Sequence, residues 1–392
     1  MNSTLQRFGR RIRLGIIGGG PGSFIGPVHR AAARLDDRFE VVASVLSSNP
    51  ERSRRYGREL GVSADRAYAD AAEFFAREMA RGDGVDAVAI MTPNDSHYPL
   101  ACAAIDGGID IICDKPLATN VKDALDLARR VEQSGLVFCL TFNYTGYPLV
   151  RQARAMVRDG DLGDIRLVQV EYVYGNSADT VEGELGDPPR HWHYRPENMG
   201  PSLILADIGS HAHHMARFVT GLEFDRVMAD VARIVPGRQA DDHAALLFTM
   251  NNGARGVMWI TQSAAGGVNG LTFRIFGSRG GLRWSQETPN QLHHSRHQAP
   301  ELTYERGGPG LKPEAMRASH VAMGHPEGYR DAFATLYEEA ADAIVSRRLG
   351  QRPERPLIDM PTVLDGVQTM KFVEAALLSS REGRWAACER AH

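Results

Sequence analysis

Short apolar runs and amphipathic stretches alternate along the first 145 residues. The apolar runs occupy residues 13–17, 40–46, 86–92, 109–113 and 136–142. Continuous apolar runs are typical of parallel strands that are buried on both faces. The intervening segments predict helices at 27–35, 50–60, 70–80, 96–107 and 120–134. This alternation predicts a doubly wound α/β domain, whose ligands bind at the carboxyl ends of the strands.

The pattern changes after about residue 147. A helical segment at 148–158 precedes strands that follow one another without helices, at 165–175, 243–250, 255–263, 271–277, 281–285 and 290–294. Successive strands predict a second α/β domain with a large, mostly antiparallel open sheet. One face of such a sheet packs on helices, and we expect the other to join a second copy. The expected domains are therefore 1–146 and 147–392.

Composition narrows the class of protein. The 392 residues fit two domains, and 43% hydrophobic with 24% charged residues is typical of a folded soluble chain. A net charge of −3 gives no reason to expect nucleic acid or a membrane surface as a partner. Four scattered cysteines without C-x-x-C spacing indicate reduced thiols. Because no apolar run is long enough to span a bilayer, we expect a cytoplasmic protein.

The first predicted strand runs into the glycine-rich sequence GGGPGSFIGPVHR, residues 18–30. Gly18 and Gly20 fit the first two glycines of a dinucleotide-binding turn. The third glycine is expected at position 23, but Ser23 stands there and Gly26 follows. The turn is thus three residues longer than usual, and a glycine-rich turn without a ligand is the alternative. The residues expected at the phosphates are Gly18, Gly20, Pro21, Gly22, Ser23, Phe24 and Ile25.

The end of the second strand bears on the choice of cofactor. An acidic residue there would bind the ribose 2′-hydroxyl of NAD, but this chain has Ser47 and Ser48, with Arg52 close behind. Hydroxyls and a guanidinium suit a 2′-phosphate, so NADP is favoured over NAD. The alternative is that the arginines form a solvated helix face.

Further polar residues follow the next strands. We expect Thr92, Pro93, Asn94 and His97, in TPNDSH, on the nicotinamide side of the cofactor. Lys115 follows another strand in CDKPLATN, and the proline after it fixes the direction of the chain. A lysine at the mouth of a parallel sheet is well placed for chemistry, although an ordinary surface lysine is the alternative. Asp114, Lys115 and Asn143 complete the expected cofactor contacts.

The stretch ILADIGSHAHHMARFVTG, residues 204–221, carries candidate acid–base residues. Asp207 is expected to cap a helix that ends at Gly221. Asp207 and His211, four residues apart, share one helical face, where the carboxylate raises the basicity of the imidazole for proton abstraction from an alcohol. His213 and His214, close to His211, suggest a metal site. However, His211 and His213 point to different faces of the helix, and no H-E-x-x-H pattern occurs. We therefore expect no metal.

The segment 174–200 is long and rich in glycine, proline and aromatic residues, which is typical of a functional loop. Aromatic and polar groups together suit a sugar ring. The expected pocket residues are Asn143, Tyr144, His191, Trp192 and Arg195, with His325 at the pocket edge.

Four motifs in this order resemble the glucose–fructose oxidoreductase / inositol dehydrogenase (Gfo/Idh/MocA) family: the loop ending in GPVHR, TPNDSH, CDKPLATN and DIGSH. The resemblance covers most of the chain. It implies a Rossmann domain followed by an α/β domain, a homodimer or homotetramer, and a catalytic group formed by Lys115, Asp207 and His211. Asp114 replaces the family's glutamate before the lysine, which leaves its part in fixing the lysine open. His214 replaces a frequent acidic residue, which leaves the substrate open.

The sequence therefore predicts an NAD(P)-dependent dehydrogenase that oxidises a secondary hydroxyl of a cyclic polyol, sugar or glycoside. In this reaction His211 takes the proton, Lys115 donates a hydrogen bond to the substrate oxygen and Asp207 orients the pair. The alternatives are a non-catalytic cofactor-sensing regulator and a reductase of a keto-sugar or an imine. A dihydrodiol dehydrogenase is a further alternative. Lys115, Asp207 and His211 together favour catalysis.

Overall fold

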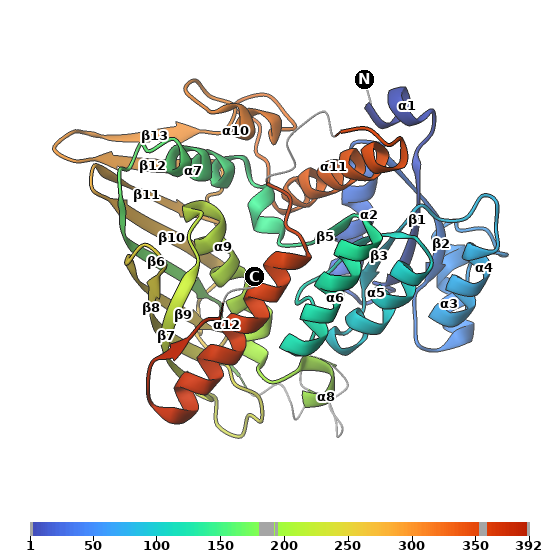
Figure 1. The fold of residues 1–392 in the computed structure, drawn as a ribbon, viewed down its shortest axis with the longest axis horizontal. Coiled ribbons are helices and arrows are strands. Elements are labelled where there is room, and N and C mark those ends of the chain that lie inside the picture. The colour runs from blue at the N-terminus through green and yellow to red at the C-terminus, as the bar shows by residue number, and fades with distance from the viewer. Residues whose placement is uncertain (1–2, 180–191, 193–194, 353–358, 390–392) are drawn as a thin grey trace. The chain divides into compact units, whose positions relative to one another are not determined.

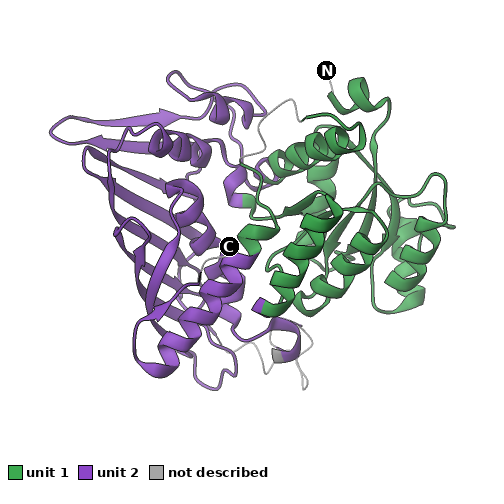
Figure 2. Cartoon of the chain, in the orientation of Figure 1, with its two compact units in different colours: residues 1–118, 122–143, 333–366 green, residues 119–121, 144–332, 367–392 purple. Residues whose placement is uncertain are grey.

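The computed structural model describes residues 3–179, 192, 195–352 and 359–389 (Figure 1). The chain forms two compact units (Figure 2). Unit 1 comprises Met1–Ala118, Lys122–Asn143 and Phe333–Gly366, and unit 2 comprises Thr119–Val121, Tyr144–Ala332 and Val367–His392. The long second segment of unit 2 begins at Tyr144, close to the expected domain boundary. Residues 333–366 return to unit 1.

Unit 1 contains a five-stranded sheet with the order β2-β1-β3-β4-β5, in which every neighbouring pair is parallel. Every residue of β3 and β4 is buried, as expected of strands covered on both faces. The five predicted strands are confirmed, with ends that differ by at most two residues. They are β1 (Ile12–Gly18), β2 (Phe39–Val45), β3 (Ala87–Met91), β4 (Asp110–Cys113) and β5 (Phe138–Leu140).

The helices of unit 1 are α1 (Ser3–Phe8), α2 (Ile25–Leu35), α3 (Pro50–Glu59), α4 (Ala71–Met79), the 3₁₀ turn η1 (Asn94–Ser96), α5 (His97–Asp106), α6 (Val121–Ser134) and most of α11 (Tyr329–Arg348). The five helices predicted for unit 1 are confirmed as α2 to α6, whereas α1 and α11 were not predicted there. Ion pairs fix α11 within this unit, because Arg38 binds Asp342 at 2.7 Å and Arg347 binds the fully buried Asp110 at 2.7 Å. The sequence pattern gave no sign that a distant segment completes the first unit.

Unit 2 contains a nine-stranded sheet with the order β13-β12-β11-β10-β6-β9-β8-β7-β14. Only β6 and β9 pair in parallel, so the prediction of a mostly antiparallel sheet is confirmed. The strands are β6 (Ile165–Val173), β7 (Phe224–Ala232), β8 (His243–Met250), β9 (Arg255–Thr261), β10 (Gly270–Gly277), β11 (Gly280–Ser285), β12 (Gln291–Arg296), β13 (Glu301–Glu305) and β14 (Ala386–Ala387). Strands β7, β13 and β14 were not predicted from the sequence.

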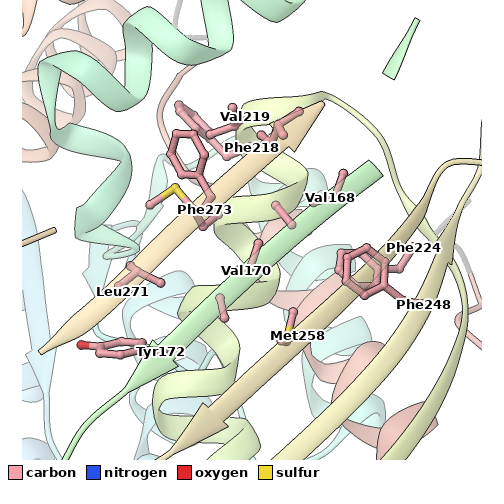
Figure 3. Close-up of a cluster of buried hydrophobic side chains, with 14 of the residues drawn as sticks. Val168, Val170, Tyr172, Phe218, Val219, Phe224, Phe248, Met258, Leu271 and Phe273 are labelled. Atoms are coloured by element: carbon pink, nitrogen blue, oxygen red, sulfur yellow. The ribbon is translucent and has the colours of Figure 1, made fainter. Parts of the chain in front are cut away.

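Side chains on one face of this sheet form the core of unit 2 (Figure 3). Val168, Val170 and Tyr172 of β6 pack there with Phe273 of β10 and with α9. The helices of this unit are η2 (Asn143–Gly146), α7 (Pro148–Arg158), α8 (Pro196–Met199), α9 (Ser210–Thr220), α10 (Pro313–Arg317) and α12 (Val363–Glu382). Within the described residues of both units, no helix is long and apolar enough to cross a membrane.

The opposite face of the sheet leaves large apolar side chains exposed. They alternate with the core residues along each strand, as the two-residue period of a strand requires. Neighbouring strands bring them together, because Leu167 of β6 pairs with Phe276 of β10 and Val257 of β9 pairs with Leu247 of β8. This set, named the open face below, comprises Leu167, Leu247, Val257, Trp259 and Phe276, which are 43–55% exposed.

Candidate active site

The glycine loop of unit 1 lies where the carboxyl ends of β1, β2 and β3 meet. A Cβ atom on Gly18 would lie 2.5 Å from the carbonyl oxygen of Met91, and one on Gly20 would lie 2.0 Å from that of Leu46. A Cβ atom on Gly26 would lie 2.0 Å from the Gly19 carbonyl oxygen. Gly26 therefore permits the close approach between helix and strand that a third glycine provides in a dinucleotide loop.

The three additional residues form a closed turn before α2. The Ser23 amide donates to the Gly20 carbonyl at 3.0 Å, and the Ser23 hydroxyl accepts the Gly26 amide at 3.1 Å. Arg30 of α2 donates to the Gly19 carbonyl at 2.7 Å, which fixes the loop to its own helix. Phe24 is 75% exposed.

The arginines of α3, the helix that follows β2, differ in their ion-pair partners. Arg54 binds Glu73 at 2.9 Å and Arg55 lies 3.5 Å from Glu59. No ion pair to Arg52 occurs in the described part of the chain, and this residue is exposed in the first turn of α3. The solvated-face alternative thus accounts for Arg54 and Arg55, whereas Arg52 is available to an anion.

One imidazole connects the turns that follow β3 and β4. His97 lies with Nδ1 2.7 Å from the Pro116 carbonyl oxygen and Nε2 3.0 Å from the Thr92 carbonyl oxygen. Its ring nitrogens therefore face main-chain groups, which supports a structural part for His97 in the predicted cofactor site. Pro93 and the buried Asn94 follow Thr92 in the same turn.

Asp114 fixes the main chain at Lys115. One carboxylate oxygen of Asp114 accepts the Lys115 amide at 3.0 Å and the Thr141 hydroxyl at 2.9 Å. The Lys115–Pro116 peptide is cis, and the side chain of Lys115 is half-buried. Although Asp114 is one methylene shorter than glutamate, it therefore holds the lysine turn through its backbone.

The residues of unit 1 fit a dinucleotide on two observations. A Cβ atom on Gly20 would lie 2.0 Å from the Leu46 carbonyl oxygen, so the loop has the close backbone packing of a dinucleotide-binding turn. Asn143, which follows β5 and is 1% exposed, has an amide nitrogen with no hydrogen-bond partner among the described residues. A buried donor at the carboxyl edge of a parallel sheet matches the polar edge of a nicotinamide.

In unit 2, the helix that carries the candidate acid–base residues begins earlier than predicted. Residues 203 and 204 are helical, Leu205–Gly209 forms a π-helical turn, and α9 follows directly. The prediction that Asp207 caps the helix is wrong, because the Ser202 hydroxyl accepts the Leu205 amide at 3.1 Å and takes that part. The predicted end is confirmed, because Gly221 has φ +68° and its amide donates to Arg217.

Aromatic rings surround His211, which is 8% exposed. The Tyr144 ring lies edge-on to the imidazole, with centroids 4.7 Å apart, and the Tyr172 centroid lies 6.3 Å away. The hydroxyls of Tyr144 and Tyr172 lie 2.6 Å apart. Burial raises the pKa of both phenols above the ordinary value, and the charge of Asp207 raises both further. Both hydroxyls therefore stay protonated at neutral pH and remain hydrogen-bond donors.

Gln262 is a site residue that the sequence analysis missed. Its amide donates to a carboxylate oxygen of Asp207 at 2.8 Å. It directly follows β9, where its neighbours resemble an ordinary strand end, so only the tertiary pairing identifies it.

The remaining candidates lie in different surroundings. His213 stacks on Phe372 with centroids 4.4 Å apart, which is a packing role. Trp192 and Arg195 are half-buried, and His325 is exposed on a turn held by Arg306. His191 lies outside the described residues. Among residues 3–179, 192, 195–352 and 359–389, no cluster of His, Cys, Asp or Glu side chains could hold a metal ion.

A parallel-sheet unit with a close-packed glycine loop after its first strand is typical of dinucleotide-dependent oxidoreductases. Residues 12–142 match the model of the oxidoreductase family with an NAD-binding Rossmann fold, and residues 150–283 match that of the GFO/IDH/MocA C-terminal domain. The chain belongs to the Gfo/Idh/MocA oxidoreductase family.

Individual relatives match along most of the chain. It is 31% identical over 375 residues to YfiI, an uncharacterised oxidoreductase of Bacillus subtilis, covering 95% of each protein. An oxidoreductase from Sinorhizobium meliloti is 42% identical with a TM-score of 0.85, covering 96% of this chain and 99% of that one. An inositol dehydrogenase homologue from Azotobacter vinelandii, complexed with NAD+, is 33% identical with a TM-score of 0.91, covering 96% and 97%.

Proposed function

We propose that the protein is an NAD(P)-dependent dehydrogenase of a cyclic polyol, sugar or glycoside, and that it oxidises a secondary hydroxyl. The observation that carries this proposal is the Asp207–His211 segment, which sets a candidate base beside the paired phenols of Tyr144 and Tyr172. The Azotobacter homologue is also described in complex with NADH and myo-inositol, and a levoglucosan dehydrogenase is 28% identical over 317 residues. Both support a ring-shaped polyhydroxyl substrate.

In this proposal each residue has a definite task. His211 accepts the proton of the reacting hydroxyl, a step that typically contributes about 10²–10⁴-fold in rate. Asp207 stabilises the imidazolium that forms. Lys115 donates a hydrogen bond to the substrate oxygen as negative charge develops there. The nicotinamide, when bound, supplies the hydride acceptor.

We assign the substrate's other hydroxyls to neutral groups. Tyr144 and Tyr172 keep their protons because burial raises the pKa of each. A phenol pair offers both donor and acceptor, which suits a vicinal diol, and its rings suit the apolar face of a sugar. Asn143, Trp192, Arg195, His191 and His325 stay predicted pocket residues.

The proposed cofactor preference is NADP over NAD. It rests on the absence of an acidic residue at positions 46–48, directly after β2, and on the exposed Arg52. Gly18, Gly20, Pro21, Gly22, Ser23, Phe24 and Ile25 would hold the pyrophosphate. Ser47, Ser48 and Arg52 would hold the 2′-phosphate.

We also propose that the open face joins two copies of the chain. Five large apolar side chains lie together there, and they are interspersed with Arg255, Arg274 and Glu171. Clustered exposed apolar side chains mark interaction surfaces, and charges of both signs on one patch allow self-complementary pairing.

The function is tested with a panel of cyclic polyols, sugars and glycosides, with NAD and NADP side by side, by absorbance of the reduced nicotinamide. We expect turnover of at least one polyhydroxyl ring compound. Binding of NADH or NADPH without turnover of any panel member would support a cofactor-sensing regulator instead. Turnover confined to keto-sugars and imines in the reducing direction, or to aromatic dihydrodiols, would favour the corresponding alternative enzyme.

A further inference from the structure

We propose that Gln262 is a positioning residue that holds the carboxylate of Asp207 in its working orientation. The carboxamide of Gln262 donates to one oxygen of Asp207 at 2.8 Å, and Gln262 is 4% exposed. The proposal rests on the proposed function, because it concerns the orientation of the carboxylate that serves His211.

The backbone of Gln262 is fixed from both sides. Its amide donates to the Asp242 carbonyl at 3.0 Å, and its carbonyl accepts the Ser177 amide at 3.2 Å. Asp242 is itself fully buried and binds Arg238 at 2.9 Å, while its carboxylate accepts the Ile234 amide at 2.7 Å. The carboxamide donor therefore starts from a rigid frame.

Asp241, which directly precedes Asp242, holds the start of the helical segment that carries Asp207. Asp241 accepts the Leu203 amide at 2.8 Å and the Ile204 amide at 3.3 Å, and it also accepts the Ser202 hydroxyl. Two adjacent residues thus hold the two partners of the hydrogen bond. Asp241 holds the helix start near Asp207, and Asp242 holds the strand end at Gln262. The Gln262 donor and the Asp207 acceptor therefore have little freedom to move relative to each other.

A neutral donor is the appropriate partner at this position. An amide N–H favours the ionised form of a carboxylate without neutralising its charge. The charge of Asp207 acts on the phenols of Tyr144 and Tyr172, and His211 follows on the same helical segment. An arginine or lysine in place of Gln262 would compete with the imidazolium for the carboxylate. Gln262 orients the charge and leaves it available to His211.

The test uses the full-length protein and three variants. Gln262→Leu removes the donor at similar size, and Gln262→Glu supplies a donor only when its carboxyl is protonated. Gln291→Leu is the matched control, because the Gln291 amide donates to Glu305 at 2.9 Å on the exposed strand β12. Thermal denaturation identifies variants that fail to fold.

We expect kcat of Gln262→Leu to fall about 10–100-fold at neutral pH, with the KM for the cofactor unchanged, since a hydrogen bond to a charged group is lost. Gln262→Glu should approach the wild-type rate toward acidic pH and lose activity as pH rises, while Gln291→Leu matches wild type. Should Gln262→Leu fail to fold, the pH profile of Gln262→Glu decides: a constant ratio to wild type at all pH values would overturn the proposal.

A second measurement does not depend on turnover. The titration of the His211 imidazole is followed by NMR on histidine-labelled protein, with His211→Asn for assignment. A loosened Asp207 stabilises the imidazolium less, so the His211 midpoint should fall by about half a pH unit or more in Gln262→Leu. Identical midpoints in Gln262→Leu and Gln291→Leu would refute the positioning role. If wild type turned over no panel compound, the proposed function would fail, whereas this titration would still decide on Gln262.

Discussion

The ring of Tyr144 lies edge-on to the imidazole of His211, with the two planes at 81° and the centroids 4.7 Å apart. The hydroxyl of Tyr144 is directed to Tyr172 instead, at 2.6 Å. The candidate base therefore has an apolar flank and a phenol pair close by. In the proposed mechanism, the negative charge of Asp207 offsets the cost of forming an imidazolium beside an apolar ring.

Replacing His211 or Lys115 by alanine should abolish catalysis and spare cofactor binding. We expect kcat/KM to fall about 10²–10⁴-fold in each variant, because each removes a group that acts on the reacting oxygen. Quenching of protein fluorescence by reduced cofactor measures binding. His293→Ala, on the distant strand β12, is the control. Near-normal turnover by either active-site variant would show that the roles are misassigned.

Arg52→Ala should change the cofactor preference. Its guanidinium is the proposed partner of the 2′-phosphate, so kcat/KM with NADP should fall about 10-fold or more while that with NAD changes little. Arg55→Ala is the matched control on the same helix, because Arg55 already pairs with Glu59. A wild-type protein that strongly prefers NAD would disprove this reading of Ser47, Ser48 and Arg52.

Gly20→Ala should prevent cofactor binding and lower stability. The new Cβ atom would lie 2.0 Å from the Leu46 carbonyl oxygen, so the loop must shift away from β2. We expect a cost of about 1–3 kcal/mol, as for other overpacked sites. Gly82→Ala is the control, because nothing lies within 4 Å of its Cβ position. Urea unfolding and cofactor titration measure both effects, and equal behaviour of the two variants would contradict the prediction.

Stability should fall on the acid side because of His29. This side chain is 1% exposed, its Nδ1 lies 2.8 Å from the Tyr337 hydroxyl, and burial lowers its pKa below the ordinary 6.5. The unfolded chain therefore binds the proton more readily than the folded chain. The contribution of neutral His29 to the free energy of unfolding is complete above pH 6.5 and is lost as pH falls below that value. His29→Gln should flatten the pH dependence of the unfolding midpoint between pH 7 and 5. His293→Gln should leave the dependence unchanged, and an unchanged slope in His29→Gln would exclude this origin.

Trp259→Arg should weaken self-association. Trp259 is 44% exposed on the open face, and a buried unpaired charge opposes association of two apolar patches. Light scattering at several concentrations should show a smaller species than for wild type. Val268→Arg, at an apolar residue 72% exposed outside the strands, is the control. A monomeric wild type, or an unchanged mass for Trp259→Arg, would argue against the open face as the interface.

Much of unit 1 could be predicted because its signals are local. Continuous apolar runs mark its strands, and the positions of Gly18, Gly20 and Gly26 depend on backbone approach that only glycine permits. In unit 2 the central strand β6 was recognisable from the alternation of Val168, Val170 and Tyr172. The short strands β13 and β14 were missed because β13 is mostly exposed and β14 has two residues, so neither shows a clear period.

Long-range partners could not be predicted. The bond from Gln262 to Asp207 joins residues 55 apart in sequence, and no local pattern indicates it. The π-helical turn at Leu205–Gly209 also escaped prediction, since a single extra residue per turn leaves the apolar period almost unchanged. The pairing of Tyr144 with Tyr172 also escaped prediction, because Tyr144 was expected in the pocket whereas Tyr172 has the pattern of an ordinary core residue of its strand.

The return of residues 333–366 to unit 1 has a consequence for biosynthesis. Asp110, whose side chain is fully buried, has Arg347 and Arg348 as its partners, and Asp86 also binds Arg348. A ribosome that has translated the five-stranded sheet has not yet made either arginine. Asp86 already has Arg10 as a partner at 2.6 Å, whereas the ion pairs of Asp110 form only after the last fifth of the chain has been made. The nucleotide unit, although encoded first, is completed nearly last, and a nascent chain stopped after residue 330 would carry it unfinished.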